Sequence, residues 1–276
     1  MNKLFEGRSL RLIAAAIVVV NGFFPAVWIL LTSLKSEAEL VSKPITYLPH
    51  ELVLSNYVQA FSDQPLLKYL GNSLAVAAAS TAVSLVVAAC AAYAIARLNL
   101  RRRQLILTCI VASSMFPLVT LLVPIFETMR NLNLLNTYTA LVLPYTVLSL
   151  PVCTLVLVSF FQSIPKDLEN AAMIDGCTRV GALWRVVVPL AAPGVFTAGI
   201  LAFVNAWDEF LLALSLNASA SMRTVPVGIS LYQGEFTFPW PVISAALIVA
   251  IVPVAVLIAV FQERVVGGLT QGGLKG

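Results

Sequence analysis

Residues 69–96 read YLGNSLAVAAASTAVSLVVAACAAYAIA and contain no Asp, Glu, Lys or Arg. A helix needs about 20 mostly apolar residues to cross the hydrocarbon core of a bilayer, so this stretch is long enough to span one. Small residues recur in it at about one helical turn, which lets helix backbones approach closely in lipid. These small residues are Ala75, Ala79, Ser80, Ser84, Ala88, Ala92 and Ala96. The stretch therefore predicts a membrane-spanning helix packed against other helices.

Five further stretches of comparable length also lack charged residues. The apolar run of the first stretch is too long for a secretory signal, and no small-residue cleavage pattern follows it, so we expect that helix to be retained. The sequence predicts an all-α membrane protein in which residues 1–276 form a single transmembrane domain with six transmembrane helices. The predicted spans are residues 10–33, 71–96, 105–127, 138–161, 191–214 and 239–262.

The composition excludes the other broad classes of protein. Hydrophobic residues make up 59% of the chain, charged residues 11%, and the mean hydropathy is +0.92. Soluble domains have about 45–50% apolar and about 25% charged residues, and disordered chains are poorer still in apolar residues. The net charge of +4 includes one dense basic run, Arg101, Arg102 and Arg103. In so apolar a chain this run indicates membrane topology, so we expect a lipid bilayer around the protein and no nucleic acid.

The distribution of Lys and Arg predicts the orientation in the membrane. Six spans place both termini on one side, together with loops 97–104 and 162–190, and that side carries twelve of the 17 basic residues. Cytoplasmic loops are enriched in Lys and Arg, so we predict that both termini are cytoplasmic. The twelve residues are Lys3, Arg8, Arg11, Arg97, Arg101, Arg102, Arg103, Lys166, Arg179, Arg185, Arg264 and Lys275.

The sequence lacks the motifs of an enzyme or a metal site. No two of the cysteines, Cys90, Cys109, Cys153 and Cys177, have the spacing of metal ligands, and the one histidine, His50, is expected at the surface. There is no GxxxxGK[ST] phosphate loop, HExxH or GxSxG. We therefore predict a chain that is not an enzyme and binds no cofactor or metal. Its energy must come from a partner or an ion gradient.

The longest predicted cytoplasmic loop, residues 162–190, reads QSIPKDLENAAMIDGCTRVGALWRVVVPL. Pro165 favours a helix start, acidic residues follow where the helix dipole favours them, Gly176 favours a helix end, and Thr178 can cap a second helix. A small-residue face on a short helix suits insertion into a groove of another protein. That face comprises Leu168, Ala171, Ala172 and Asp175.

This loop resembles the EAA loop of permease subunits of binding-protein-dependent ABC importers. The family pattern is Glu-Ala-Ala, three residues, Gly, nine residues, and Ile-x-Leu-Pro. Ala171, Ala172, Gly176 and Pro189 stand in register with it, whereas Asn170, Val186 and Val188 replace its Glu, Ile and Leu. The resemblance implies that the loop docks into an ATPase. It assigns that coupling role to Glu169, Asn170, Ala171, Ala172, Asp175, Gly176 and Pro189.

The resemblance covers nearly the whole chain. Residues 115–137, 202–216 and 238–253 are similar to the maltose-type carbohydrate-uptake group. In the C-terminal tail, 263–276, residues 265–276 are similar to the tail of the second permease of that group. This implies the type I ABC importer architecture in a bacterial inner membrane, with a sugar or related polyol as cargo. The implied partners are a second permease in a pseudo-twofold heterodimer, an ATPase dimer that holds ATP and Mg, and an extracytoplasmic substrate-binding protein.

Polar residues near the outer end of the fifth predicted span suggest a second site. Asn205 and Asp208 share one helical face and Glu209 lies beside it, and charges within a span are costly unless they have a function. These three residues are candidates for lining the substrate pathway, and structural hydrogen bonding is the alternative. By resemblance, the outward loop 215–238 is a candidate contact for the binding protein.

Other functions fit parts of the sequence. The nearest alternative keeps the ABC role with glycerol phosphate or another polar solute as cargo. An ion-coupled secondary transporter could use Asp208, Glu209 or Glu127 as carriers, but it leaves the EAA spacing unexplained. An integral-membrane enzyme lacks a nucleophile or metal motif.

Overall fold

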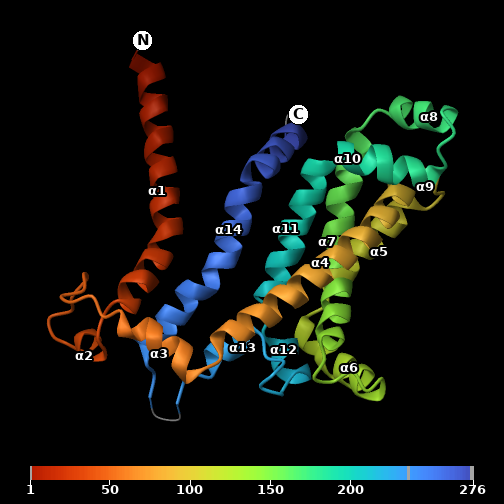
Figure 1. Ribbon diagram of the computed structural model, residues 1–276. Coiled ribbons are helices and arrows are strands. Elements are labelled where there is room, and N and C mark those ends of the chain that lie inside the picture. Colours follow the sequence, from red (N-terminus) through yellow and green to blue (C-terminus); the bar gives the residue numbers. More distant parts are fainter. Residues whose placement is uncertain (1, 235–236, 274–276) are drawn as a thin grey trace. The chain divides into compact units, whose positions relative to one another are not determined.

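The computed structural model describes the backbone of residues 2–234 and 237–273 and the side chains of residues 12–234 and 237–261 (Figure 1). The tail predicted over 263–276 therefore lies outside the residues whose side chains are described. Within the described chain all regular structure is helical, as predicted, and four helices are long and apolar enough to cross a membrane. Two bent helix pairs raise that number to six if each pair is one span. The four long helices are α1 (Asn2–Ser33), α4 (Leu66–Arg97), α7 (Tyr138–Ser163) and α14 (Trp240–Gly273).

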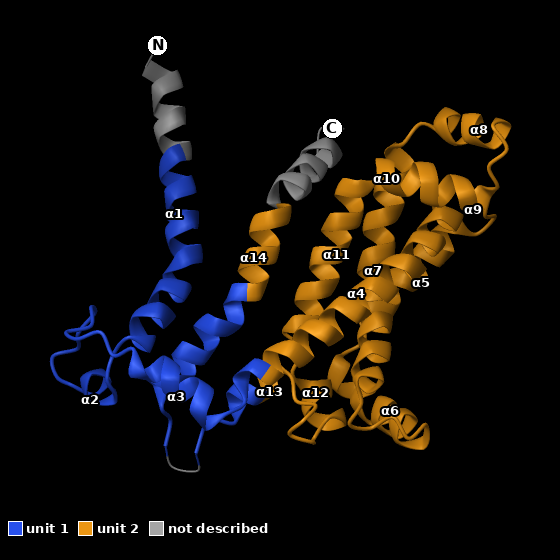
Figure 2. Cartoon of the chain, viewed as in Figure 1, with its two compact units in different colours: residues 1–67, 228–252 blue, residues 68–227, 253–276 orange. Residues whose placement is uncertain are grey.

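The chain divides into two compact units, coloured separately in Figure 2. The first comprises residues 1–67 and 228–252 and includes α1, α2 (Glu37–Leu40) and α3 (Ser55–Asp63). The buried Asn56 amide donates to the carbonyls of Ser33 and Lys35, 2.9 Å away in each case, and so fastens α3 to the end of α1. The apolar side chains in the membrane-length part of α1 are exposed within this unit.

The second unit, residues 68–227 and 253–276, holds both regions that the sequence singles out. Its core forms where α4, α7 and α11 (Ala192–Trp207) meet, and it is paved with alanine. Packing between α7 and α11 is tight, because a Cβ on Gly194 would lie 2.3 Å from Cγ of Phe160. The helices α8 (Lys166–Ile174), α9 (Arg179–Ala182) and α10 (Val188–Leu190) lie at one end of α7, and α6 (Leu118–Asn131) and α12 (Leu211–Leu216) lie at the other (Figure 1).

The third predicted span is not one straight helix. Residues 105–127 belong to α5 (Arg103–Ser114) and α6 (Leu118–Asn131), which are bent by 89° at the break between them. Pro117 causes the break, because proline disfavours helical backbone in the residue before it. Its own backbone is extended, with ψ 128°.

The fifth predicted span, 191–214, is also interrupted. Helix α11 ends at Trp207, and α12 (Leu211–Leu216) begins after a three-residue break. The preceding segment, 179–190, is bent by 83° against α11 and contains a π-helical turn, Leu183–Val187. Pro189 and Pro193 have no N–H to donate, which favours irregular helix in this region. The short α13 (Val225–Ser230) follows on the chain.

Candidate functional site

Helix α8 and its ends form the loop that resembles the EAA motif. The helix starts after Pro165, and Asp175 is its C-cap. Gly176 has φ +91°, its N–H donates to the carbonyl of Met173 (3.1 Å), and the N–H of Cys177 donates to that of Ala172 (2.9 Å). These two bonds form a Schellman motif, which confirms that Gly176 ends the helix.

The second helix of the loop also begins as predicted. The Thr178 side chain accepts a hydrogen bond from the N–H of Gly181 (3.1 Å) and caps α9. Beyond α9, Leu183 and Val187 of the π-helical turn are buried in the core of the second unit. Pro189 is exposed on α10. The loop is therefore anchored in the helical core at its C-terminal end.

The side of α8 away from the core is exposed and carries large apolar side chains among polar ones. Ile174 is 86% exposed and Leu168 47% exposed, and Val180 of α9 is also exposed at 66%. The predicted coupling residues Asn170, Ala171 and Asp175 are exposed as well, whereas Ala172 is half-buried. Large apolar side chains exposed on a short helix between two spans favour a surface that binds a partner.

The opposite face of α8 carries a buried charge. Glu169 is 6% exposed, and its Oε2 lies 3.1 Å from Nε of Arg97, although that N–H is not aligned for a hydrogen bond. The hydroxyl of Tyr93 donates to Glu169 Oε1, and Nη2 of Arg97 donates to the carbonyl of Ile164 (3.0 Å). Glu169 therefore faces α4 and is not on the exposed face with Asn170.

The sequence did not identify Tyr93 and Arg97 as functional residues. Arg97 counted only as one of the basic residues that set topology, and Tyr93 lay within an apolar run. The sequence feature that could have identified them is their spacing of four residues, which places both on one face of a predicted span near its end.

A cleft of about 270 Å³ lies where the break between α5 and α6 and the break between α11 and α12 meet α7. Polar groups line it beside apolar side chains, so it can offer hydrogen bonds and a nonpolar surface to one solute. The lining residues are Ser114, Phe116, Leu118, Tyr145, Leu148, Ser149, Asn205, Ala206 and Glu209.

Of the three predicted pathway residues, the structure brings Asn205 and Glu209 to this cleft. Asp208 is exposed at the C-cap of α11 and does not line the cleft. The prediction that Asn205 and Asp208 share one face assumed a helix that continues through residue 214. Helix α11 instead ends at Trp207, directly before Asp208. Glu127 is exposed on α6 and also lies outside the lining.

The Glu209 carboxylate is held by donors from the protein itself. It accepts from the hydroxyl of the buried Tyr145 (2.6 Å) and from the N–H groups of Leu212 (2.8 Å) and Ala213 (3.1 Å). The last two bonds satisfy free N–H groups at the start of α12. Glu209 therefore fixes the break between α11 and α12 and shapes the cleft.

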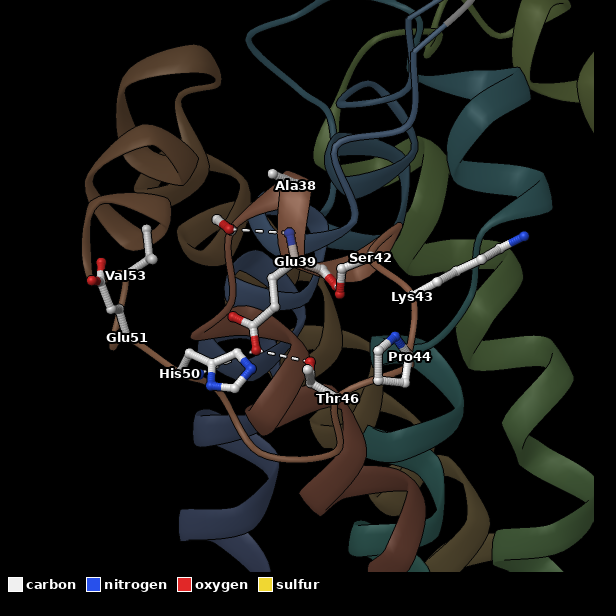
Figure 3. Close-up of a pocket in the computed structure, with 10 residues that line it drawn as sticks. Ala38, Glu39, Ser42, Lys43, Pro44, Thr46, His50, Glu51 and Val53 are labelled. Carbon is white, nitrogen blue, oxygen red and sulfur yellow. Dashed lines mark hydrogen bonds between the residues drawn. The ribbon is translucent and has the colours of Figure 1, made fainter.

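A second cavity, of about 530 Å³, lies in the segment between α1 and α3 (Figure 3). Glu39 points toward His50 and Thr46 there, and it accepts from the Thr46 hydroxyl (2.8 Å) and the His50 N–H (3.1 Å). Burial alone would raise the pKa of Glu39, but these hydrogen bonds outweigh it and hold the pKa below its ordinary value. This network orders the segment between α1 and α3 and includes none of the predicted site residues.

The described part of the chain contains no group of three or more His, Cys, Asp or Glu side chains placed to hold a metal ion.

Over nearly its whole length the chain is similar to permease proteins of transport systems. The chain is 72% identical, over all of its 276 residues and 97% of the relative, to the sulfoquinovosyl glycerol transport system permease protein of Agrobacterium fabrum. It is 36% identical, over 98% of its length and 97% of the relative, to the trehalose/maltose transport system permease protein of Thermococcus litoralis.

A solved structure shares the fold. A chain of a bacterial ABC transporter that imports the acidic polysaccharide alginate superposes with a TM-score of 0.79 at 21% identity, over 95% of this chain and 96% of that one. Residues 84–270 match the family of binding-protein-dependent transport system inner membrane components. The chain belongs to that family and is a permease subunit of an ABC importer.

Proposed function

We propose that this chain forms, with a second permease, the membrane passage of an importer for a sugar or related polyol, and that α8 docks into an ATPase subunit. The observation that carries the coupling role is the exposed side of α8, where the large apolar side chains of Ile174 and Leu168 are 86% and 47% exposed. Because the loop is anchored in the helical core, movement of a partner bound to α8 would displace the core helices. The ATPases hold ATP and Mg, and this chain binds neither.

The cleft at the two helix breaks supports a hydroxyl-bearing cargo. Hydroxyl, amide and carboxylate groups of Ser149, Asn205 and Glu209 lie beside Phe116 and Leu148. Hydroxyl groups of a solute exchange hydrogen bonds with the first set, and its nonpolar faces pack on the second. A volume of about 270 Å³ is below the range of about 300–1,000 Å³ for small-molecule sites, so we expect the partner permease to complete the passage.

The names of the relatives support a carbohydrate cargo. The relative at 72% identity is named for sulfoquinovosyl glycerol, and the one at 36% for trehalose and maltose. Sulfoquinovosyl glycerol is therefore the first cargo to test, and glycerol phosphate remains the alternative.

The proposed orientation has both termini, α8 and α9 in the cytoplasm, with the binding protein on the opposite side. The excess of basic residues on the predicted cytoplasmic side supports it. The outward segment after α12 is the proposed contact for the binding protein. Its first part is fastened to α4, because the Asn72 amide donates to the carbonyls of Ser221 (3.0 Å) and Arg223 (2.8 Å).

An Ile174→Glu variant tests the docking role. A carboxylate on the exposed face of α8 should release the ATPase, because docking would bury the charge without a partner. The readouts are the amount of ATPase that copurifies in mild detergent and ATP-driven uptake in proteoliposomes. Gln162→Glu adds the same charge to an exposed residue in the last turn of α7, outside α8, and should change neither. Full copurification and uptake with Ile174→Glu would refute docking through α8.

A competition experiment tests the cargo. Vesicles that contain the complex and its cognate binding protein are given labelled sulfoquinovosyl glycerol against excess unlabelled maltose, trehalose or glycerol phosphate. We expect ATP-dependent uptake that only a sugar or glycoside competes with. Competition by glycerol phosphate alone would contradict a sugar cargo.

A further inference from the structure

The buried contacts of Arg97 join three parts of the second unit. Arg97 is the last residue of α4, it donates to the carbonyl of Ile164 just after α7, and it pairs with Glu169 on α8. We propose that Tyr93, Arg97 and Glu169 form a rigid link through which movement of α8 displaces α4 and α7. All three are positioning residues, and the inference rests on the proposed coupling role of α8.

Burial makes this contact strong enough to act as a link. The side chains of Arg97 and Glu169 are 4% and 8% exposed. Two charges taken out of water are stable only while each keeps its partner, because separation leaves both buried and unpaired. The Tyr93 hydroxyl occupies the other carboxylate oxygen, so the whole Glu169 side chain is held from α4. Helix α8 therefore cannot separate from α4 without a large loss of electrostatic stabilisation.

The link continues into the packed core. Tyr93 lies one helical turn before Arg97 and packs in the cluster that contains Leu157 and Phe161 of α7 and Val187 of the π-helical turn. Ala198 and Ala202 of α11 belong to the same cluster. Densely packed interiors transmit displacement. A shift of α8 therefore reaches α11, which carries Asn205 at the cleft.

A double-mutant cycle tests the link in the assembled importer. The variants are Arg97→Gln, Glu169→Gln and the double variant, with Arg102→Gln as the control because Arg102 is exposed on the same loop as the end of α4. Each complex is purified with its ATPase and reconstituted. The readouts are the ATPase copurified and the cargo transported per ATP hydrolysed.

We expect each single variant to retain its ATPase and to lower the transport-to-hydrolysis ratio about fivefold or more, the size of typical coupling free energies. The double variant should be no worse than the poorer single variant, because it removes the unpaired buried charge. Arg102→Gln should match the unmodified protein. An unchanged ratio in the single variants, or losses that multiply in the double variant, would overturn the proposal.

Tyr93→Phe keeps the test decisive if loss of Arg97 prevents folding. It removes one hydroxyl and leaves the ring in the core, so we expect normal assembly with a smaller loss of the ratio, about twofold. A structural role alone would lower the yield of complex and leave the ratio intact. If Ile174→Glu loses transport while Tyr93→Phe and Glu169→Gln keep a normal transport-to-hydrolysis ratio, the link is refuted and the docking role stands. If Ile174→Glu is fully active, the docking role is refuted.

Discussion

Gly176 shows how one residue ends α8, the helix proposed to dock into the ATPase. Its φ of +91° is in the left-handed region, and a Cβ placed there would meet no heavy atom within 4 Å. The backbone conformation, rather than crowding within the chain, therefore requires glycine. Asn is the other residue that adopts this conformation at modest cost.

A comparison of Gly176→Ala with Gly176→Asn separates backbone strain from contact with the ATPase. Alanine should destabilise the end of α8 by about 1 kcal/mol, and asparagine by less. If strain is the only cost, the Asn variant transports better than the Ala variant in ATP-driven uptake assays. The reverse order would mean that the larger side chain collides with the docked partner.

Glu209 differs from its neighbour Asp208 in its surroundings. It accepts from Tyr145, Leu212 and Ala213, whereas Asp208 is exposed and outside the cleft. Two adjacent acids with similar sequence signals therefore have different roles, and the break in the helix decides which of them faces inward.

Glu209→Gln should reduce uptake more than Asp208→Asn. The glutamine side chain has one acceptor oxygen, so a donor that meets the carboxylate is left unpaired, at a cost of about 1–3 kcal/mol. The checks are the initial rate of cargo uptake and the thermal stability of the purified complex. Equal losses in both variants would show that charge near this position, and not the Glu209 network, matters.

At the scale of elements, the contact between α7 and α11 connects the loop to the cleft. Close approach of these helices depends on Gly194, where a side chain would overlap Phe160. The buried Cys153 on α7 also donates its Sγ–H to the carbonyl of Ala198 (3.6 Å). Small residues thus set the distance between the two helices, as is common in membranes.

Gly194→Ala should lower the thermal stability of the complex, because overpacking costs about 1–3 kcal/mol. Gly71→Ala is the matched control, since it is also a helical glycine and its Cβ would meet nothing within 4 Å. Unfolding in detergent, followed by thiol accessibility at Cys153, reports the effect. A Gly194→Ala variant as stable as Gly71→Ala would show that Phe160 moves aside freely.

At the scale of the whole molecule, family membership decides between the functions that the sequence left open. A permease of a binding-protein-dependent system draws its energy from partner subunits, so neither an ion-coupled secondary transporter nor a membrane enzyme describes the chain. Of the three possible carriers for secondary transport, Glu209 lines the cleft, whereas Asp208 and Glu127 do not.

Cysteine labelling checks the proposed orientation. In a background without the other native cysteines, a membrane-impermeant maleimide added outside should label Ala218→Cys and leave Cys177 unlabelled until the membrane is opened. Ala218 is exposed after α12, and Cys177 lies between α8 and α9. Labelling of Cys177 in sealed cells would reverse the orientation.

The sequence predicted the all-helical fold and the caps of the cytoplasmic loop, because these depend on apolar length and local hydrogen bonding. Pro117 lies inside the third predicted span, where proline favours a kink, and the 89° bend lies there. The sequence did not predict the break after Trp207, because apolarity alone does not distinguish a straight span from an interrupted one. The pairing of Arg97 with Glu169 was also out of reach, since it joins residues far apart in the chain. Bends and long-range contacts depend on tertiary packing, and they are what form the cleft and the link.

The cleft lies along the first half of α7, and α8 follows the other end of α7. Ser149 lies about 20 Å along α7 from Ser163, where the loop that contains α8 starts, and the alanine-paved core lies between. If the cleft binds the solute and α8 docks into the ATPase, as proposed, natural variation at Phe116 or Ser149 changes which solute is accepted and leaves the ATPase-binding surface the same. Gene duplication followed by substitutions in the cleft would then yield importers for new nutrients that use the same ATPase.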